Sequence, residues 1–458
     1  MAVKDGSLLP LPRATREGRE GVSLLPLLAP AIASRPIAWR HGRVIQLAEF
    51  VQHVAAVAAG LDAGSAMINL CEDRYHFLIA YAAALSREHT VLLPSSRAEQ
   101  IVGEVQKTND GSYRCGDSDV AAVLRAENSF PASVDVTIPA ATTAMVGFTS
   151  GSTGQPKAFP KLWSSVTAST LRNAVGIRNE LRMGPDSTAW ILATVPPQHM
   201  YGMELSILLP LVGGMAVHEG RPLFPADIAQ ALAELPEPRV LVSTPVHLRA
   251  IVESPLQFPA TALIISATAP LDATLAQAVE AKLGGRLLEM FGSTETCVFA
   301  NRCTAIEAAW QLYEGVQLRP LPDGTEVNAP WFVTPITLQD IVELQEGGRF
   351  IVRGRNTDLI EVAGKRASIA DITRRLLAIE GVQDAVVFQP DPEAIAKIRR
   401  VAALVVAPGL NARQVLARLA PGVDPAFLPR PLLIVESLPR NEVGKLPRES
   451  LLRALRRE

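Results

Sequence analysis

The sequence predicts an α/β fold, with a large layered N-terminal domain of mostly parallel sheets and a small α+β domain at the C-terminus. Three observations carry this prediction. The chain has 458 residues, which is enough for two or three domains. Short apolar strands alternate with amphipathic helices through most of it, as they do in parallel sheets. Turn-forming residues then gather near Gly354, and a second series of strands and helices follows.

Residues 1–35 are rich in Pro, Gly, Arg and Leu without clean periodicity, so we expect an extended lead-in. From Ile37 the pattern predicts a hairpin that turns at His41-Gly42. A helix should follow, because apolar side chains recur three and four residues apart at Phe50, Val54, Val57 and Leu61. The next predicted elements are a strand at 66–70, a helix at 75–85 and a strand at 89–93.

The same alternation continues to the domain boundary and resumes beyond it. In the middle of the chain we expect strands at 188–194, 215–218, 239–243 and 262–266, with helices such as 228–235 and 271–283 between them. The boundary is placed within 354–358, which gives domains of 1–354 and 355–458. In the second domain we expect a helix at 369–379, strands near 384–389 and 401–407, and a helix at 411–420.

Composition excludes several classes of protein. Forty-four Lys and Arg against 46 Asp and Glu give a net charge of −2, so the chain has no overall basic field for nucleic acid. The longest apolar run, 205–217, is interrupted by Pro and two Gly and is too short to cross a bilayer. Acidic residues and prolines around 22–34 argue against a signal peptide. Four Cys without zinc-ligand spacing favour free thiols and a cytoplasmic location.

A dense polar loop follows a short apolar strand in residues 144–157, AMVGFTSGSTGQPK. Glycine lets backbone N–H groups turn towards an anion, while hydroxyl groups and a lysine add donors and charge. The pattern favours a phosphate-binding loop over a flexible linker, and its residues are Thr149, Ser150, Gly151, Ser152, Thr153, Gly154 and Lys157. It is not a Walker loop, because the Gly-x-x-x-x-Gly-Lys-Ser/Thr spacing is absent.

The stretch TSGSTGQPK resembles the signature loop of the adenylate-forming superfamily, which includes acyl- and aryl-CoA synthetases, peptide-synthetase adenylation domains and luciferases. Further blocks that resemble the family's motifs occur in the family's order over most of the chain: PQHMYG at 197–202, SATAPL at 266–271, FGSTE at 291–295, Gly354-Arg355 with Asp358, and LPRNEVGKLPR at 438–448. The resemblance implies that the C-terminal domain is a mobile lid.

The resemblance also implies a reaction and roles for single residues. A carboxylate attacks the α-phosphate of ATP, and because both are negative, cations and fixed dipoles must converge there. Lys445 is expected to bridge the two groups in the transition state. Thr294 is expected at the α-phosphate, and Glu295 should bind Mg²⁺, a cation that prefers oxygen ligands. His199 should border the acid pocket beside the carboxylate.

Other implied roles concern the nucleotide. Ser150, Thr153 and Lys157 would hold the β- and γ-phosphates. Asp340 would bind both ribose hydroxyls, and Arg355 would support the ribose and the α-phosphate. Glu289, Phe291, Gly292 and Ser293 would complete the nucleotide site.

The chain departs from the family pattern in several places. Ala158 stands where the family has Gly, Leu338-Gln339 precedes Asp340 where Thr-Gly is usual, and Thr357 occupies the hinge position. Only 44 residues separate Glu295 from Asp340, which indicates a trimmed subdomain.

Two positions bear on the acid. Ala267 stands where many relatives carry Gly, and Met290 stands where relatives with long substrates often carry Gly, so the added volume should shorten the pocket. A compact acid is therefore favoured, and an aromatic one such as a hydroxybenzoate fits best. The residues around 289–296 are similar to ligases of xanthomonadin and aryl polyene pathways, which load an acyl carrier protein.

The accepting thiol is that of CoA or of a carrier protein, and both remain open. The alternatives are a fatty acyl-CoA or acyl-AMP ligase and a non-catalytic adenylate-binding module.

Overall fold

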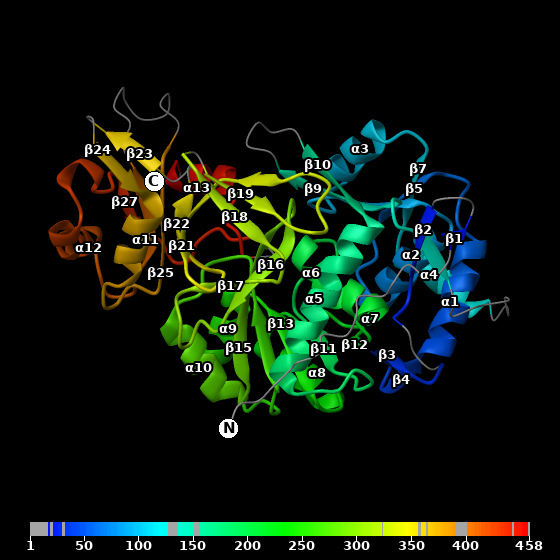
Figure 1. The fold of residues 1–458 in the computed structure, drawn as a ribbon. Helices are drawn as coiled ribbons and strands as arrows, with labels where there is room; N and C mark the ends of the chain where they lie inside the picture. The colour runs from blue at the N-terminus through cyan, green and yellow to red at the C-terminus, as the bar shows by residue number, and fades with distance from the viewer. Residues whose placement is uncertain are drawn as a thin grey trace. The chain divides into compact units, whose positions relative to one another are not determined.

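The computed structural model describes residues 17–18, 22–29, 33–126, 136–150, 156–322, 324–355, 359–362, 365–390, 401–441 and 444–456 (Figure 1). The chain divides into two compact units. The first runs to Ala308 and includes Pro330–Val333, and the second comprises Ala309–Ala329 and the residues from Thr334 onward. This division lies upstream of the boundary at 354–358, which stays a prediction.

The larger sheet of the first unit is mainly parallel. Its strands lie in the order β16-β15-β14-β13-β11-β12-β3-β4, and only the outer pairs β15–β16 and β3–β4 are antiparallel. The strands are β3 (Pro36–Arg40), β4 (Arg43–Gln46), β11 (Trp190–Ala193), β12 (Ala216–His218), β13 (Arg239–Ser243), β14 (Leu263–Ser266), β15 (Arg286–Ser293) and β16 (Cys297–Arg302). Because the inner strands are parallel, their carboxyl ends share one edge of the sheet, which is where α/β proteins place ligands.

A second sheet has the order β10-β9-β6-β5-β7, in which only β10 runs antiparallel to its neighbour. Its strands are β5 (Ala66–Asn69), β6 (Thr90–Leu93), β7 (Ser112–Cys115), β9 (Thr143–Ser150) and β10 (Pro156–Leu162). A small antiparallel sheet is formed by β1 (Glu17–Gly18), β2 (Val22–Pro26) and β8 (Thr137–Pro139). The first of these strands lie in the region predicted to be an extended lead-in.

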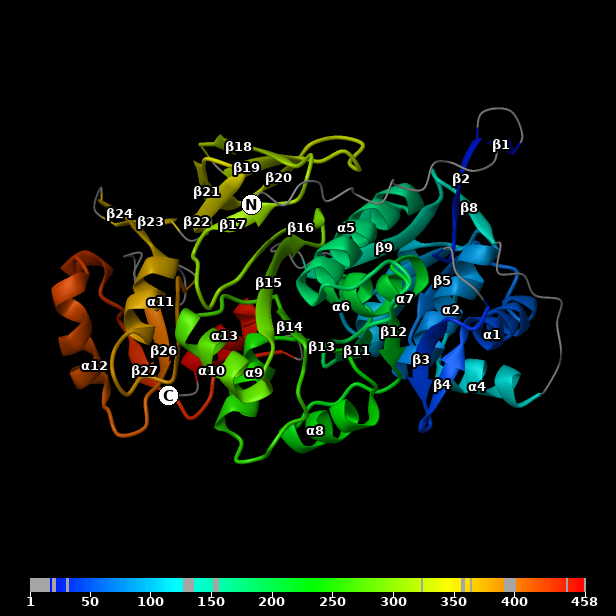
Figure 2. The same ribbon diagram turned by 60° about the horizontal axis from the view of Figure 1, so that its bottom comes forward.

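Helices cover both faces of the larger sheet (Figure 2). The helical segments of the first unit are α1 (Leu47–Ala59), α2 (Arg74–Ser86), α3 (Glu99–Thr108), α4 (Asp117–Arg125), α5 (Trp163–Leu181), α6 (Met200–Met203), the π-helical turn η1 (Glu204–Leu208), α7 (Leu209–Val212), α8 (Pro225–Glu234), α9 (Pro245–Glu253) and α10 (Ala273–Leu283). Helices α8, α9 and α10 pack on one face through Leu232, Ile251 and Val279, which meet Leu241 and Ile264 of the sheet. Helix α5 contacts β14 and β16.

The second unit contains several small sheets. Its strands are β17 (Trp310–Leu312), β18 (Gln317–Leu321), β19 (Gly324–Asn328), β20 (Ile336–Leu338), β21 (Asp340–Gln345), β22 (Arg349–Arg355), β23 (Leu359–Val362), β24 (Lys365–Ser368), β25 (Asp384–Phe388), β26 (Ala402–Val406) and β27 (Leu432–Ile434). Its helical segments are α11 (Ile369–Leu377), α12 (Ala412–Leu419), η3 (Ala420–Gly422), η4 (Pro425–Phe427) and α13 (Arg448–Leu455). The sheet β25-β26-β27 packs through Val405 on Leu376 and Val415, and through Leu404 on Leu451.

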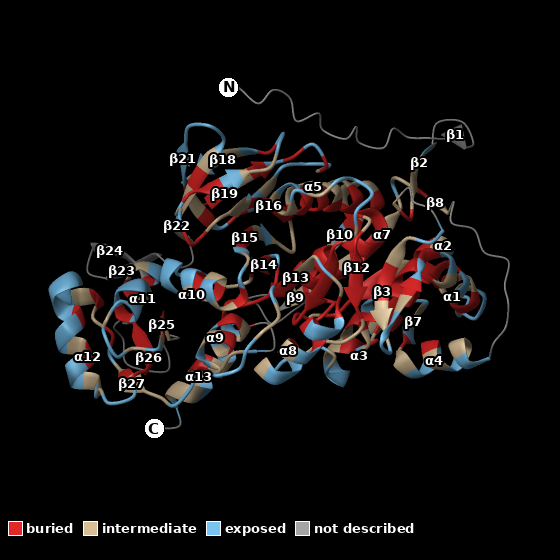
Figure 3. Ribbon diagram, turned by 90° about the horizontal axis from the view of Figure 1, so that it is seen from below, coloured by how far each residue is buried: buried red, intermediate tan, exposed pale blue. Residues whose placement is uncertain are grey.

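The predicted α/β class and the layered, mostly parallel arrangement are confirmed. In Figure 3 the central strands are buried, while the outer faces of helices such as α12 are exposed. This difference in burial produces the alternation of apolar strands and amphipathic helices from which the fold class was predicted. Helix α2 is buried on all sides from Arg74 to Leu85, and such a helix lacks an amphipathic stripe. None of the helices that the structure describes combines the length and the apolar character of a membrane span.

Candidate active site

The predicted phosphate loop connects two paired strands. Strands β9 and β10 form an antiparallel hairpin whose register places Lys157 opposite Thr149 and Pro156 opposite Ser150. Residues 151–155 lie outside the described residues, and with them Gly151, Ser152, Thr153 and Gly154 of the prediction. The Lys157 side chain is exposed, with its Nζ 5.3 Å from the ring centroid of Phe159. The hairpin therefore presents a cation at the base of the loop.

The predicted α-phosphate and metal residues lie on the connection between β15 and β16. Gly292 is required there, because a Cβ atom at this position would lie 2.2 Å from the carbonyl oxygen of Cys297. The backbone N–H of Ser293 donates to Oγ1 of Thr296 at 3.1 Å, and Thr296 Oγ1 donates to the Cys297 carbonyl at 2.9 Å. Cys297 itself has a φ of +60°, which only a tight turn favours. These constraints fix the backbone that presents Thr294 and Glu295.

Strand β9 lies against this connection. A Cβ atom on Gly147 would be 2.9 Å from Cγ2 of Thr294 and 3.8 Å from Cε of Met200. Three blocks that are far apart in sequence therefore meet at one place: the strand that leads into the phosphate loop, the FGSTE block and the PQHMYG block.

Glu295 has the chemistry of a magnesium ligand. Within the described part of the chain its carboxylate makes no hydrogen bond or ion pair, while its backbone carbonyl accepts a hydrogen bond from Nζ of Lys161. The described residues contain no group of three or more His, Cys, Asp or Glu that could enclose a metal ion. Mg²⁺ is commonly held by one or two carboxylates together with the phosphates of a nucleotide, and a single available carboxylate fits that pattern.

The PQHMYG block is held at the carboxyl edge of the larger sheet. The Tyr201 hydroxyl lies 3.1 Å from the carbonyl oxygen of Ser243 and 3.0 Å from that of Ile265, so it joins the ends of β13 and β14. Arg74 is fully buried and donates to the carbonyl oxygens of Ala193 at 2.9 Å and Val195 at 2.8 Å. Burial lowers the pKa of Arg74 to about 9. His199 is half-buried and immediately precedes α6.

The two residues predicted to line the acid pocket lie side by side. Ser266 pairs with Glu289 in the register of β14 and β15, so Ala267 and Met290 follow at neighbouring positions. Both are buried, with 8% and 4% of their surface exposed. Side chains alternate along a strand, so Met290 lies on the sheet face opposite Leu287, which packs with α10.

Glu289 belongs to an ion pair. Arg302 Nη2 lies 2.7 Å from Glu289 Oε2, and Thr304 Oγ1 donates to the same oxygen at 2.6 Å. Burial raises the pKa of Glu289, and the Arg302 charge opposes this effect. The side chain thus ties β15 to β16, and its role toward the nucleotide stays a prediction. Phe291 stacks edge-on against Phe299 with ring centroids 5.4 Å apart.

In the second unit, the two predicted ribose residues lie on adjacent strands. Asp340 of β21 stands directly opposite Arg355 of β22. The Thr325 hydroxyl donates to the backbone carbonyl of Asp340 at 2.6 Å, which fixes the strand at this point. The predicted hinge residues Thr357 and Asp358 lie outside the described residues. Lys445 is exposed, and its backbone N–H donates to Oδ1 of Asn441 at 2.8 Å.

These blocks are shared with a known family. The model of the AMP-binding enzyme family matches residues 43–354, about two thirds of the chain. The chain belongs to this family. Membership confirms the predicted superfamily and the prediction of an AMP-forming enzyme that joins an acid to a thiol.

Individual relatives agree with the family match. A 4-coumarate–CoA ligase of Rhodobacter capsulatus is 29% identical over 297 residues, which cover 65% of this chain and 73% of the relative. A 3,4-dihydroxybenzoate–[aryl-carrier protein] ligase of Bacillus anthracis is 22% identical over 341 residues, covering 72% and 78%. The structure of O-succinylbenzoate coenzyme A synthetase from Bacillus subtilis with AMP superposes with a TM-score of 0.78 at 17% identity, over 93% of this chain and 98% of that one.

Two charged residues that contact the backbone of this connection, Glu204 and Lys161, were not identified from the sequence. Both are buried, with 1% and 7% of their surface exposed. Their signals were faint: Glu204 directly precedes the apolar run 205–217, and Lys161 is the next-to-last residue of the short strand β10. Neither pattern indicates a partner, because the groups they bind lie 94 and 134 residues away in sequence.

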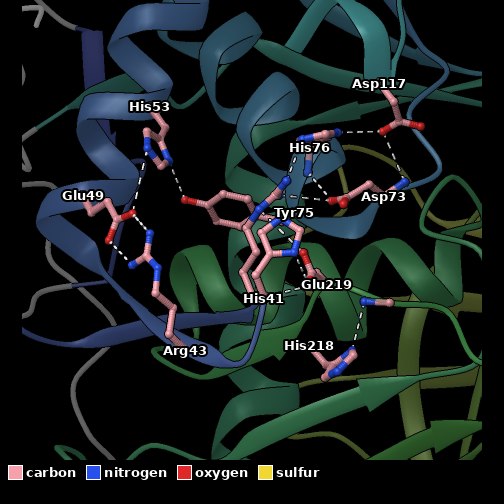
Figure 4. Close-up of polar contacts among 12 residues, drawn as sticks. His41, Arg43, Glu49, His53, Asp73, Tyr75, His76, Asp117, His218 and Glu219 are labelled. Carbon is pink, nitrogen blue, oxygen red and sulfur yellow. Dashed lines mark hydrogen bonds and ion pairs between the residues drawn. The ribbon is translucent and has the colours of Figure 1, made fainter. Parts of the chain in front are cut away.

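A separate polar cluster lies at the β3–β4 hairpin (Figure 4). His53 Nδ1 lies 2.8 Å from the Tyr75 hydroxyl, and His76 Nδ1 lies 3.0 Å from Asp117 Oδ1. A cavity of about 260 Å³ is lined here by basic side chains that include Arg40 and Arg43. Both arginines are already paired with carboxylates, Arg43 with Glu49 and Arg40 with Asp73 and Glu219, so the charge is balanced within the cluster.

Proposed function

We propose that this protein adenylates a compact aromatic carboxylic acid with ATP and transfers the acyl group to the thiol of CoA or of an acyl carrier protein. The observation that carries the proposal is the meeting of β9, the FGSTE block and the PQHMYG block at Gly147, Thr294 and Met200. The family match and the aryl acids named for the two curated relatives support it.

The first step joins the carboxylate to the α-phosphate and releases pyrophosphate, and the thiol then displaces AMP. Mg²⁺, when bound, supplies positive charge that neutralises the phosphate oxygens. Glu295 would hold this ion, because its carboxylate is available within the described part of the chain. Thr294 and the loop between β9 and β10 would bind the phosphates, with Lys157 adding a cation. These contacts lower the barrier because they are in place before charge develops.

Lys445 would act in the first step only. We propose that it lies on a mobile domain and bridges the carboxylate and the α-phosphate during adenylation. A rotation about residues 354–358 would then withdraw it and admit the thiol. The family match ends at residue 354, where the sequence places the domain boundary, and this agreement supports the proposal.

The size of the acid follows from buried side chains. Ala267 directly follows the end of β14, Met290 follows Glu289 on the adjacent strand β15, and both are almost entirely buried. Packed interiors leave little spare volume, so each added side chain shortens the space for the acid. A benzoate or cinnamate ring fits this expectation better than a long acyl chain.

The test is carboxylate-dependent exchange of labelled pyrophosphate into ATP. Purified protein is assayed with hydroxybenzoates, cinnamates, a short dicarboxylate and fatty acids of increasing length. We expect exchange with the aromatic acids, and thioester formation with CoA or a phosphopantetheinylated carrier protein. Exchange with fatty acids alone would contradict the aromatic assignment, and no exchange with any acid would contradict the proposed activity.

A further inference from the structure

A buried carboxylate lies directly behind the connection that carries Thr294 and Glu295. Glu204 begins η1, and its oxygens accept the backbone N–H of Val298 at 3.0 and 3.1 Å. The β15–β16 pairing shifts register between Phe291 and Gly292, next to the Gly292–Val298 pair. At this irregularity the Glu204 side chain binds the Val298 amide. Such irregularities are common next to active sites, where they change the direction in which a side chain points.

Helix α5 supplies the remaining partners of Glu204. The Ser169 hydroxyl donates to Oε2 at 2.8 Å, and the Asn173 amide donates to it at 3.3 Å. Burial raises the pKa of the carboxyl to about 7, while these donors and the charge of Lys161 oppose the rise. All the described partners of Glu204 donate, so the network is built to hold a carboxylate.

A buried cation holds the other end of the same connection. Lys161 of β10 donates through Nζ to the backbone carbonyl of Glu295. Lys161 thus binds the backbone of Glu295, and Glu204 binds the backbone of Val298, three residues later. Two opposite charges from separate elements therefore fix the ends of one short segment.

Stability alone does not account for this arrangement. Removing two charged groups from water costs free energy that their attraction often fails to recover, so buried ion pairs are weak evidence for stabilisation. The arrangement does fix geometry, because each charge binds a single backbone group of the segment.

We propose that Glu204 is a positioning residue for adenylation, which with Lys161 holds the 294–298 segment in the orientation that binds MgATP. The proposal rests on the proposed roles of Thr294 and Glu295. Glu204 acts through the Val298 amide, and its contribution is to the geometry of the nucleotide site.

The test compares conservative and truncating changes at Glu204. MgATP binding is measured by titration calorimetry, which requires no acid, and KM and kcat are measured by pyrophosphate exchange. We expect Glu204→Ala to weaken MgATP binding about tenfold or more, with a matching rise in the KM for MgATP. Glu204→Gln keeps one acceptor for Val298 but places an NH2 group among the Ser169 and Asn173 donors, so its MgATP binding should fall between that of wild type and that of Glu204→Ala. Glu219→Gln, a part-buried carboxylate of the separate polar cluster in Figure 4, is the matched control and should bind normally.

Folding is followed by circular dichroism and thermal denaturation. If Glu204→Ala does not fold, Glu204→Asp keeps the charge and shortens the side chain by one methylene, and we expect it to bind MgATP more weakly than Glu204→Gln. Variants that lower only the melting temperature, with binding and KM unchanged, would overturn the proposal. Wild-type protein that binds MgATP but exchanges no pyrophosphate would contradict the proposed function, and calorimetry would still decide the role of Glu204.

Discussion

Arg440 binds the carboxylate of Asp384 through three hydrogen bonds of 2.8 to 3.1 Å. The same guanidinium donates to the carbonyl oxygen of Gly444 at 2.8 Å, immediately before Lys445. The segment that carries the proposed catalytic lysine is thus attached to β25 by an arginine whose planar fork fits a carboxylate.

This attachment predicts a defect when the carboxylate is lost. Asp384→Asn removes the charge and half of the acceptor capacity that Arg440 uses, so the lysine segment should become less well ordered. We expect the kcat for pyrophosphate exchange to fall about tenfold, with the KM for MgATP little changed. Arg440→Lys should behave similarly, because lysine cannot form the fork. An unchanged kcat in both variants would show that the lysine is positioned by other contacts.

Lys445→Ala should strongly reduce the rate of adenylation without affecting stability. The side chain is exposed, so its removal creates no cavity. Loss of one charged donor at developing negative charge costs roughly 10²–10³-fold in rate. The readout is the rate of pyrophosphate exchange, with Lys107→Ala, at another exposed lysine on α3, as the control. Exchange retained in Lys445→Ala would remove this residue from the mechanism and leave the remaining assignments intact.

Gly147→Ala should damage the nucleotide site. The new Cβ atom would lie 2.9 Å from Thr294 Cγ2, and β9 cannot retreat because it is paired with β6 and β10 on both sides. We expect a loss of about 1–3 kcal/mol in unfolding free energy and weaker MgATP binding. Gly103→Ala on α3 has open space around the added methyl group and is the matched control. It should be neutral or stabilising, since alanine favours a helix.

Comparing the predicted and observed positions of particular residues shows which features of this fold a sequence can predict. The helix at Phe50 and Val54 was predictable because its apolar stripe repeats at helical spacing, and the structure places α1 there. Asp340 was assigned by its spacing to Gly354-Arg355; the register pairs it with Arg355, and its role toward the ribose stays a prediction. Glu204 was not predictable, because its partners Ser169 and Val298 reach it only after folding. Local pattern therefore identifies elements and motifs, while buried polar networks depend on the tertiary structure.

Met290→Ala should change the choice of acid. The Met290 side chain is 96% buried, so its truncation leaves space that a longer substrate could fill. We expect the ratio of kcat/KM for a C6 or C8 fatty acid to that for a benzoate to rise about tenfold or more. Leu288→Ala, two positions earlier on the same face of β15, controls for general loosening of the core. Equal shifts in both variants would show that Met290 does not border the acid.

The Glu204 carboxyl predicts a dependence of stability on pH. Its pKa is raised from 4.5 to about 7, mainly by burial. Between these values the unfolded chain has released the proton while the folded chain retains it, so raising the pH favours the unfolded state. The contribution of this group to the unfolding free energy is fully present below pH 4.5 and declines by about 3 kcal/mol as the pH rises to 7. Glu204→Gln cannot titrate and should remove this slope.

Urea unfolding of both proteins between pH 5 and 8 checks this expectation. The difference in unfolding free energy between wild type and Glu204→Gln isolates this carboxyl from all other titrating groups. It should shift in favour of the variant as the pH rises and level off above about pH 7. Thr337→Ser, an exposed change on β20 that involves no titrating group, should show a constant difference from wild type. A constant difference for Glu204→Gln as well would mean that the carboxyl titrates at its ordinary pKa, and that water reaches it in the folded protein.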